Sequence, residues 1–299
     1  MASIRSRLIR QLITLSPAKR NCRRLRYLPA GQFKSAQHPP KLRDHARYSI
    51  NLSDIDGMPM WTFAPKHRIS HKTVLYLHGG AYVNGLSRAH WTLIAQLVDA
   101  TGHTFCVPEY PLAPCSNVSQ AMGMLINVYA SLSKQTLPEN IIFMGDSSGG
   151  GLCLALAQQL SLNNARLPSR LMLLSPWLDA SMTHPDIASL NAIDPLQDAD
   201  GLARAGQLYA GELDIFHPWI SPLYGPLTGL PPISLFIGTQ DILFPDCKRL
   251  VGYARALDVS IDQHVYEDMF HGWMFSSMPE GRRAMEQIVA LLQKSPSAK

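Results

Sequence analysis

The stretch IIFMGDSSGG, residues 141–150, decides how the rest of the chain is interpreted. Its apolar run at 141–144 predicts a buried strand, and the apolar residues from Leu152 onward predict a helix. The small and polar residues between them therefore form a tight turn from strand to helix. Such a turn accepts only small side chains two residues before and two residues after its central residue, because larger ones would collide where the backbone folds back.

The turn contains two adjacent serines, and the pattern G-x-S-x-G selects one of them. Gly145 and Gly149 stand two residues on either side of Ser147, whereas Asp146 stands two residues before Ser148. Ser147 is therefore the candidate nucleophile, and Ser148 would offer its backbone N–H to a developing oxyanion. The competing interpretation is a loop without chemistry, because Gly and Ser punctuate loops generally.

Strand-like and helix-like segments alternate along most of the chain. Two strand-like runs flank the turn signal Asp56-Gly57. Beyond them, apolar runs predict strands at 73–78, 104–110, 141–146, 170–176, 233–238 and 262–267. Helical patterns separate these runs at 88–101, at 116–134, after Gly149, at 245–257 and at 280–293. Buried strands that alternate with helices predict a mostly parallel sheet flanked by helices, which is the α/β class.

Residues 177–230 interrupt this alternation with polar sequence that contains several prolines and a helical piece near 202–213. The interruption is too long for an ordinary loop. We expect it to form part of a lid over the strand ends, to which the N-terminal segment could add the rest.

Composition limits the class of protein. Of the 299 residues 46% are hydrophobic and only 16% charged, against roughly 25% charged residues in an average soluble domain, so we expect a large buried core. No apolar run is long enough to span a membrane. The cysteines form no C-x-x-C pair, which favours reduced, buried thiols in a cytoplasmic protein over a disulfide framework or a zinc site. They are Cys22, Cys106, Cys115, Cys153 and Cys247.

The net charge of +5 comes from the N-terminus, because residues 1–26 hold eight basic residues and no acidic one. The rest of the chain is mildly acidic, so the charge gives no reason to expect nucleic-acid binding. Apolar residues recur at helical spacing in this segment and predict an amphipathic helix. Three interpretations remain: a packing helix with a solvated basic face, a membrane-surface helix, or a targeting presequence. Packed over the acyl pocket, the apolar residues would form part of the lid; they are Ile4, Leu8, Leu12 and Leu15.

A serine hydroxyl becomes a nucleophile when a histidine takes its proton and a carboxylate orients that histidine. Where G-x-S-x-G presents the serine, the carboxylate and then the histidine follow it in the chain, each beyond the end of a strand. Two later histidines, His184 and His217, precede the strand at 233–238, and His264 lies inside the last strand. His271, in the loop after that strand, is therefore the candidate base.

The carboxylate should follow the strand at 233–238, where the sequence GTQD places Asp241. Asp246 is the weaker alternative, because it falls in the following helix. Taken alone, Asp241 could be an ordinary loop aspartate and His271 a packing histidine. Their order behind the serine motif favours the functional interpretation.

The segment LHGGAY, residues 77–82, follows the first strand of the alternating region. Gly79 and Gly80 let the backbone approach a substrate closely, so their N–H groups are candidate oxyanion donors together with that of Ser148. A glycine turn without chemistry is the alternative.

From about residue 60 to 290, the chain resembles the hormone-sensitive-lipase-like family of α/β-hydrolase esterases. The motifs that carry the resemblance are HGGAY (78–82), EYPLAP (109–114), GDSSGG (145–150), SPWLD (175–179), WISPLYGPLTGLPP (219–232), GTQDIL (238–243) and FHGW (270–273). The resemblance implies an α/β-hydrolase fold with a cap segment at 1–45, a catalytic domain at 46–299 and a cap insertion at about 180–225, after the sixth strand. It also matches Ser147, Asp241 and His271 to the catalytic triad, and Gly79, Gly80 and Ser148 to the oxyanion hole.

By the same resemblance, the protein is expected to be a serine carboxylesterase that hydrolyses short- to medium-chain esters of small molecules through an acyl-enzyme, without a cofactor or a metal. The chain departs from the family pattern at Ala81, where a third glycine is usual, and at Pro111 and Cys115 in the EYPLAPC segment. An amidase or peptidase on the same scaffold and a non-catalytic small-molecule-binding relative are the alternatives. Weak lipid contact through the basic N-terminal helix and a homodimer stay open.

Overall fold

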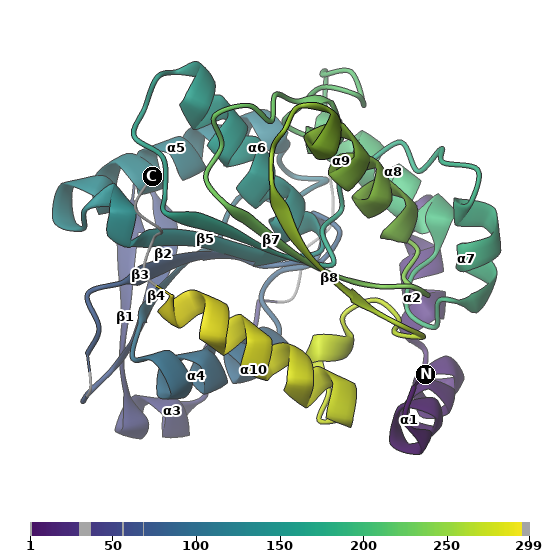
Figure 1. Ribbon diagram of the computed structural model, residues 1–299, viewed down its shortest axis with the longest axis horizontal. Helices are drawn as coiled ribbons and strands as arrows, with labels where there is room; N and C mark the ends of the chain where they lie inside the picture. Colours follow the sequence, from purple (N-terminus) through teal and green to yellow (C-terminus); the bar gives the residue numbers. More distant parts are fainter. Residues whose placement is uncertain (1, 30–36, 56, 68, 295–299) are drawn as a thin grey trace.

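The computed structural model describes residues 2–29, 37–55, 57–67 and 69–294. Its centre is an eight-stranded sheet with the order β1-β2-β4-β3-β5-β6-β7-β8 (Figure 1). The strands are β1 (Tyr48–Ile55), β2 (Met58–Pro65), β3 (Thr73–Leu77), β4 (Thr104–Pro108), β5 (Ile141–Asp146), β6 (Arg170–Leu174), β7 (Ile233–Gly238) and β8 (Ile261–Tyr266). β2 pairs antiparallel with β1 and with β4, and all other pairs are parallel. The predicted α/β-hydrolase fold with a mostly parallel sheet is confirmed.

Helices cover both faces of this sheet. Figure 1 shows α5, α6 and α9 on one face and α4 and α10 on the other. The helices are α1 (Ile4–Leu15), α2 (Ala18–Arg24), α3 (Leu42–Arg47), α4 (Arg88–Thr101), α5 (Val118–Gln135), α6 (Ser148–Leu162), α7 (Ile187–Ile193), α8 (Ala199–Ala210), α9 (Phe244–Ala256) and α10 (Pro279–Gln293). Short 3-10 turns follow at η1 (Leu25–Tyr27), η2 (Pro138–Asn140), η3 (Pro222–Tyr224) and η4 (Trp273–Phe275). The patterns at residues 37–47 and 187–193 had not predicted α3 or α7.

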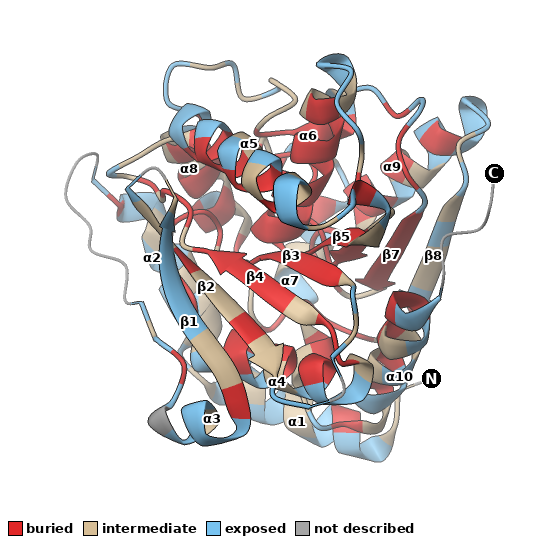
Figure 2. Ribbon diagram, turned by 90° about the vertical axis from the view of Figure 1, so that its left-hand side faces the viewer, coloured by how far each residue is buried: buried red, intermediate tan, exposed pale blue. Residues whose placement is uncertain are grey.

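Successive residues of the central strands point to opposite faces, and each face has its own core. Leu75 and Phe143 pack on the side of α5 and α6, whereas Val74 and Ile142 pack on the side of α4 and α10. β3, β5 and β7 are buried along their whole length, while the edge strand β1 is exposed or half-buried beyond its first residue (Figure 2). This is why the central strands are written as continuous apolar runs rather than as alternating ones.

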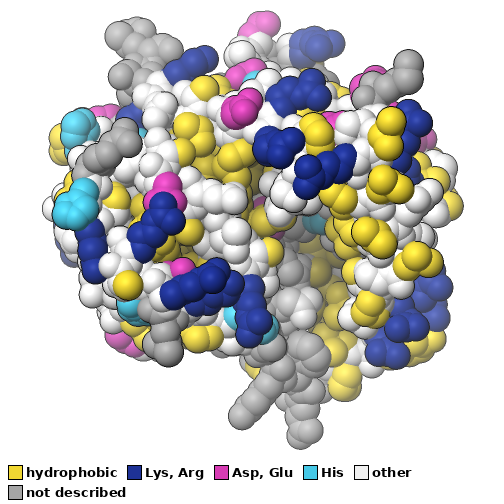
Figure 3. Space-filling model, turned by 90° about the horizontal axis from the view of Figure 1, so that it is seen from below, with side chains coloured by type: hydrophobic (Ala, Val, Ile, Leu, Met, Phe, Trp, Pro, Cys, Tyr) yellow, Lys and Arg dark blue, Asp and Glu magenta, His cyan; other side chains and the backbone are white. Residues whose placement is uncertain are grey.

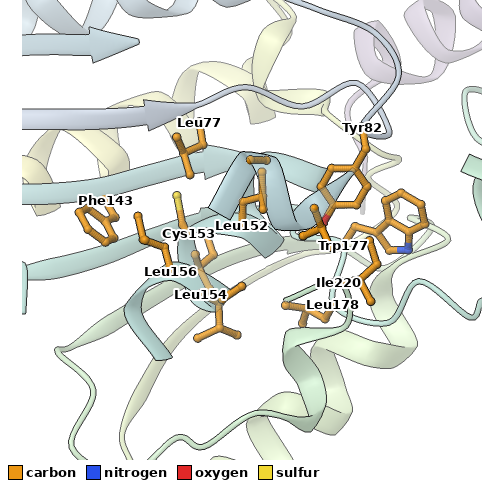
Figure 4. Packing of buried hydrophobic residues seen from close by; sticks show 14 of the residues in the cluster. Leu77, Tyr82, Phe143, Leu152, Cys153, Leu154, Leu156, Trp177, Leu178 and Ile220 are labelled. Atoms are coloured by element: carbon orange, nitrogen blue, oxygen red, sulfur yellow. The ribbon is translucent and has the colours of Figure 1, made fainter. Parts of the chain in front are cut away.

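Helix α6 is the most buried helix and carries the candidate nucleophile at its N-terminus. Apolar side chains emerge from it on several sides, and Figure 4 shows Leu152, Leu154 and Leu156 between Phe143 of β5 and Trp177 of the loop after β6. A helix that is hydrophobic all round must be enclosed by other elements. The turn before α6 is therefore fixed to the centre of the core.

Helix α1 has the opposite orientation to that expected for a lid. Its apolar stripe faces solvent: Ile4 is 78%, Leu8 56%, Leu12 68% and Leu15 85% exposed. The expectation that these four side chains pack over the acyl pocket is therefore wrong. The inner face of α1 consists instead of small and β-branched residues, with Ser6 buried and Ile9 and Ile13 packed against the core on the α10 side.

Cys106, Cys153 and Cys247 are buried and Cys22 is half-buried, as expected, whereas Cys115 is exposed. Within the described residues, no helix is both long and apolar enough to cross a membrane.

Candidate active site

Ser147 lies alone between the end of β5 and the start of α6, in a strained conformation. Its φ is 52° and its ψ is −122°, a region that a residue with a side chain rarely adopts. Its backbone N–H donates to the carbonyl of Leu174 (2.9 Å) and its carbonyl accepts from the N–H of Trp177 (2.8 Å). These bonds to the end of β6 and the loop beyond it hold the turn in place.

Both glycines of the motif lie so close to backbone atoms that no side chain fits at either position. A Cβ on Gly149 would lie 2.0 Å from the carbonyl oxygen of Leu77, and a Cβ on Gly145 would lie 2.5 Å from the carbonyl of Gly149. Neither backbone can withdraw, because Leu77 ends β3 and Gly149 belongs to α6. The structure thus gives the steric reason for small residues on both sides of Ser147.

Asp241 and His271 meet beyond the ends of β7 and β8. The Nδ1–H of His271 donates to both carboxylate oxygens of Asp241, at 3.1 and 3.0 Å. Asp241 is fully buried and His271 is 7% exposed. Asp241 also accepts from the backbone N–H of Leu243 (2.9 Å). Asp246 instead pairs with Arg249 (2.9 Å) within α9, so the structure brings Asp241 and not Asp246 to the histidine.

The environment of His271 favours its protonated form. Burial alone lowers the pKa of the imidazole, but the charge and hydrogen bond of Asp241 and the charges of Asp194 and Asp146 together raise the pKa to about 9. Three carboxylates therefore act on one buried histidine, and Asp241 contributes most of the opposition to burial.

The loop after β3 places Gly80 and Ala81 at the site, whereas the N–H of Gly79 is bound to a carboxylate. The N–H of Gly79 donates to Asp146 (2.9 Å), so the predicted role of Gly79 as an oxyanion donor conflicts with its bonding. Gly80 and Ala81 line the same cavity as Ser147. In the described part of the chain, their N–H groups have no hydrogen-bond partner. Ser148 is the first residue of α6, where a backbone N–H has no partner within the helix.

This loop is held in a conformation that demands specific residues. Gly80 has a φ of +132°, and a Cβ there would lie 2.3 Å from the carbonyl oxygen of Asn84. Ala81 has a φ of 55°, which explains why a glycine is usual at this position and why a small residue still fits.

Asp146 is a site residue that the sequence analysis missed, although its position inside the serine motif was a usable signal. It is buried and accepts hydrogen bonds from the hydroxyl of Tyr76 (2.7 Å) and the N–H of Gly79. Burial alone raises its pKa, but His90 at 3.5 Å and these hydrogen bonds lower the pKa below its usual value. Asp146 therefore joins the nucleophile turn to the loop that carries Gly80.

A cavity of about 550 Å³ contains both Ser147 and His271. Its walls come from the N-terminal segment, the insertion after β6 and the loops after β3 and β5. They include Ala18, Asn21, Cys22, Arg24, Leu25, Leu28, Gly80, Ala81, Asn84, Asp146, Leu196 and Gln197. Among the described residues, no group of three or more His, Cys, Asp or Glu side chains could hold a metal ion.

The N-terminal segment and the insertion contact each other and line this cavity together. Helix α2 lies so close to α8 that a Cβ on Gly201 would be 2.1 Å from the carbonyl oxygen of Cys22. Arg23 pairs with Asp198 at 2.9 Å, and the Lys19 ammonium donates to the carbonyl of Asp194 (2.7 Å). α2 and η1, rather than α1, therefore supply N-terminal residues that line the cavity.

Comparisons with known proteins agree with this architecture. The sequence matches the alpha/beta hydrolase fold family over residues 74–275. It is 33% identical to an acetyl-hydrolase of Streptomyces hygroscopicus, over 74% of this chain and 75% of the relative. It is 32% identical to an esterase of Acinetobacter venetianus, over 72% of each chain.

Solved structures extend the similarity to nearly the whole chain. An esterase from the bacterial hormone-sensitive lipase family superposes with a TM-score of 0.83 and 27% identity, over 99% of this chain and all of the other. The chain therefore belongs to the alpha/beta hydrolase fold family and, within it, to the hormone-sensitive-lipase-like branch.

Proposed function

We propose that this protein is a serine carboxylesterase with Ser147 as nucleophile, His271 as base and Asp241 as the carboxylate that orients it. The observation that carries the proposal is the hydrogen-bonded pair of His271 and Asp241, which opens into the same cavity as a serine on a strained turn. The relatives that are acetyl-hydrolases and esterases support the same reaction class.

In this mechanism the Oγ of Ser147 attacks the ester carbonyl while the Nε2 of His271 takes the hydroxyl proton. The N–H groups of Gly80, Ala81 and Ser148 stabilise the oxyanion. The tetrahedral intermediate then breaks its bond to the alcohol, which leaves with the proton from His271. A water molecule, deprotonated by the same histidine, releases the carboxylic acid and restores the serine.

Turnover of a chromogenic acetyl ester tests the reaction class, and labelling by an organophosphate tests the nucleophile. We expect ester turnover and a covalent adduct on Ser147. Absence of both would favour the non-catalytic small-molecule-binding alternative. A panel of esters, amides and carbamates distinguishes the esterase from an amidase or peptidase, which would prefer the amides.

We further propose that the substrates carry short to medium acyl chains. Leu28 is buried and lines the cavity, so Leu28→Ala should remove apolar contact from a longer chain. We expect the hexanoyl-to-acetyl ratio of kcat/KM to fall by about tenfold, the scale of a few methylene contacts in an apolar pocket. Ile4→Ala, in the exposed stripe of α1, is the matched control and should keep the ratio. Equal ratios in both variants would contradict a role of the cap in acyl selection.

Esterase activity should depend on pH through His271. The imidazole must be neutral to accept the serine proton, and its raised pKa of about 9 keeps it protonated at lower pH. The value of kcat/KM should therefore rise with pH, with a midpoint above the unperturbed imidazole value of about 6.5. A pH profile with a soluble acetyl ester measures this midpoint. A midpoint at or below the unperturbed value would mean that the carboxylates around His271 do not act as the geometry indicates.

We also propose that the exposed face of α1 binds an anionic lipid surface. The apolar stripe of Ile4, Leu8, Leu12 and Leu15 faces solvent. Charge complementarity favours lipid as the partner, because α1 carries Arg5, Arg7 and Arg10 and no acidic residue. Hydrophobic side chains gather beside Lys and Arg side chains on the underside of the molecule, toward the edge where Figure 1 places α1 (Figure 3). A cytoplasmic location remains a prediction from the cysteine pattern.

Vesicle flotation tests the lipid contact. The wild-type protein should float with vesicles that contain phosphatidylserine and much less with pure phosphatidylcholine. The double variant Leu8→Glu with Leu12→Glu should lower the bound fraction by about tenfold or more, because each buried leucine contributes roughly 1.5–3 kcal/mol, while turnover of a soluble acetyl ester persists. Failure of the wild-type protein to float would contradict the proposal. If the double variant then turned a dimer into a monomer, the stripe would be the interface of a homodimer.

A further inference from the structure

A second buried carboxylate stands beside the proposed triad and belongs to the cap. Asp194 follows α7 in the insertion and is 1% exposed. A buried carboxylate that forms no ion pair costs free energy unless several donors satisfy it. In the part of the chain that the structure describes, Asp194 has no side-chain ion-pair partner, so its burial needs an explanation.

Three backbone N–H groups from two separate elements satisfy this carboxylate. One oxygen accepts from Leu196 (2.8 Å) and Gln197 (3.0 Å), two residues of the insertion that line the cavity. The other oxygen accepts from the N–H of Ile242 (3.0 Å), the residue directly after Asp241. One side chain therefore fixes both a wall of the cavity and the loop that carries the proposed catalytic acid.

Asp194 also contacts the N-terminal part of the cap. The Lys19 ammonium donates to the backbone carbonyl of Asp194 at 2.7 Å. Lys19 belongs to α2, which lines the same cavity through Ala18 and Asn21. Two parts of the protein that line the cavity, α2 and the insertion, are thus joined at one residue to the loop after β7, which carries Asp241.

We propose that Asp194 is a positioning residue that couples the cap to the catalytic acid loop and sets the charge next to His271. The proposal rests on the triad of the proposed function. An amide cannot replace the carboxylate, because its NH₂ group would face an N–H donor on one of the two sides.

The charges that act on His271 come from three elements: Asp241 after β7, Asp194 in the insertion and Asp146 at the end of β5. Burial and the charge of Asp241 raise the pKa of Asp194 above its usual value, and His271 and the N–H donors of Leu196 and Gln197 oppose this shift. Hydrogen bonds from N–H groups to both oxygens favour the ionised form. In that form, Asp194 helps to keep His271 protonated, so removal of its charge should move the activity profile to lower pH.

The test is the pH profile of kcat/KM for a soluble acetyl ester in Asp194→Asn. We expect kcat/KM to fall by about 10²-fold, as for a misplaced catalytic group, and the midpoint to shift to lower pH. Asp198→Asn is the matched control, because Asp198 is a buried carboxylate of the same insertion that bonds the Gly201 N–H and Arg23 but not the acid loop. It should keep the wild-type midpoint.

An unchanged midpoint in Asp194→Asn, or the same shift in both variants, would overturn the proposal. Should Asp194→Asn fail to accumulate as folded protein, Asp194→Glu provides the test: it keeps the charge, but its extra methylene cannot leave all three N–H bonds in place. Wild-type kcat/KM in that variant would also overturn the positioning role. Organophosphate labelling of the wild-type enzyme distinguishes failure of the proposed triad from failure of the positioning role of Asp194, because absence of an adduct on Ser147 would refute the triad itself.

Discussion

Replacement of Ser147 by alanine should lower kcat for ester hydrolysis by about 10⁶-fold, the loss found when a triad enzyme loses its nucleophile. Ser147 lies on the strained turn and lines the same cavity as His271. Without its Oγ no acyl-enzyme can form, and only binding and oxyanion stabilisation remain. Steady-state kinetics on a chromogenic acetyl ester measure the loss, and mass spectrometry should find no organophosphate adduct in the variant.

Ser148→Ala is the control for this substitution, because alanine keeps the backbone N–H that the mechanism uses. The Oγ of Ser148 accepts a long hydrogen bond from the N–H of Tyr82 (3.4 Å), whose loss should cost about tenfold in rate at most. An adduct on Ser148, or a larger loss in Ser148→Ala than in Ser147→Ala, would show that the wrong serine has been assigned.

Asp241→Asn should lower kcat by about 10⁴-fold, the effect expected when an amide leaves a catalytic histidine in the wrong tautomer. The carboxylate of Asp241 accepts the Nδ1–H of His271 and the backbone N–H of Leu243. An asparagine can still accept one of these bonds, so the fold should persist while Nε2 loses its role as a base. Thermal unfolding checks the fold, and turnover of the acetyl ester checks the chemistry.

Asp246→Asn is the matched control, since Asp246 is a buried carboxylate only five residues further along the chain. It bonds Arg249 and not His271, and burial raises its pKa to about 6. The variant should lose some stability with the Arg249 pair and keep most of its turnover. A severe loss of turnover in Asp246→Asn beside a nearly silent Asp241→Asn would reverse the choice of catalytic acid.

The sequence alone predicted a mostly parallel sheet and the order of its strands along the chain. Apolar runs predicted the strands to within one or two residues, as at 233–238, because a strand covered on both faces must be apolar throughout. The pattern around Ser147 also predicted its turn, because Gly145 and Gly149 contact backbone atoms of Gly149 and Leu77, and these contacts leave no room for a side chain.

The pairing of Asp241 with His271 could be predicted from chain order, since each follows a strand and neighbouring parallel strands end at the same edge of the sheet. The sequence could not predict which backbone N–H groups around Gly79 are free to act as oxyanion donors. This depends on the carboxylate of Asp146, which is distant in sequence and accepts the N–H of Gly79.

The orientation of helix α1 could not be predicted from the sequence for the same reason. Its periodicity predicted an amphipathic helix, but a periodic stripe does not state which side of the helix faces the protein. Tertiary contacts decide this: Glu280 in α10 accepts the N–H of Ser3 (2.6 Å) and the hydroxyl of Ser6, so the side of α1 that carries Ser6 is turned inward. The apolar stripe is left in solvent.

The contacts of Asp194 at the site could not be predicted from the sequence either. In the sequence it is one aspartate in a polar insertion, and no local pattern distinguishes it from Asp186 or Asp198. Its partners Leu196 and Gln197 are near in the chain, but Ile242 lies far along it and is brought close only when the insertion folds over the ends of the strands. Local sequence thus determined the strands, most of the helices and the nucleophile turn. The tertiary structure decided which buried polar groups form hydrogen bonds with each other, because those partners are set by packing between distant segments.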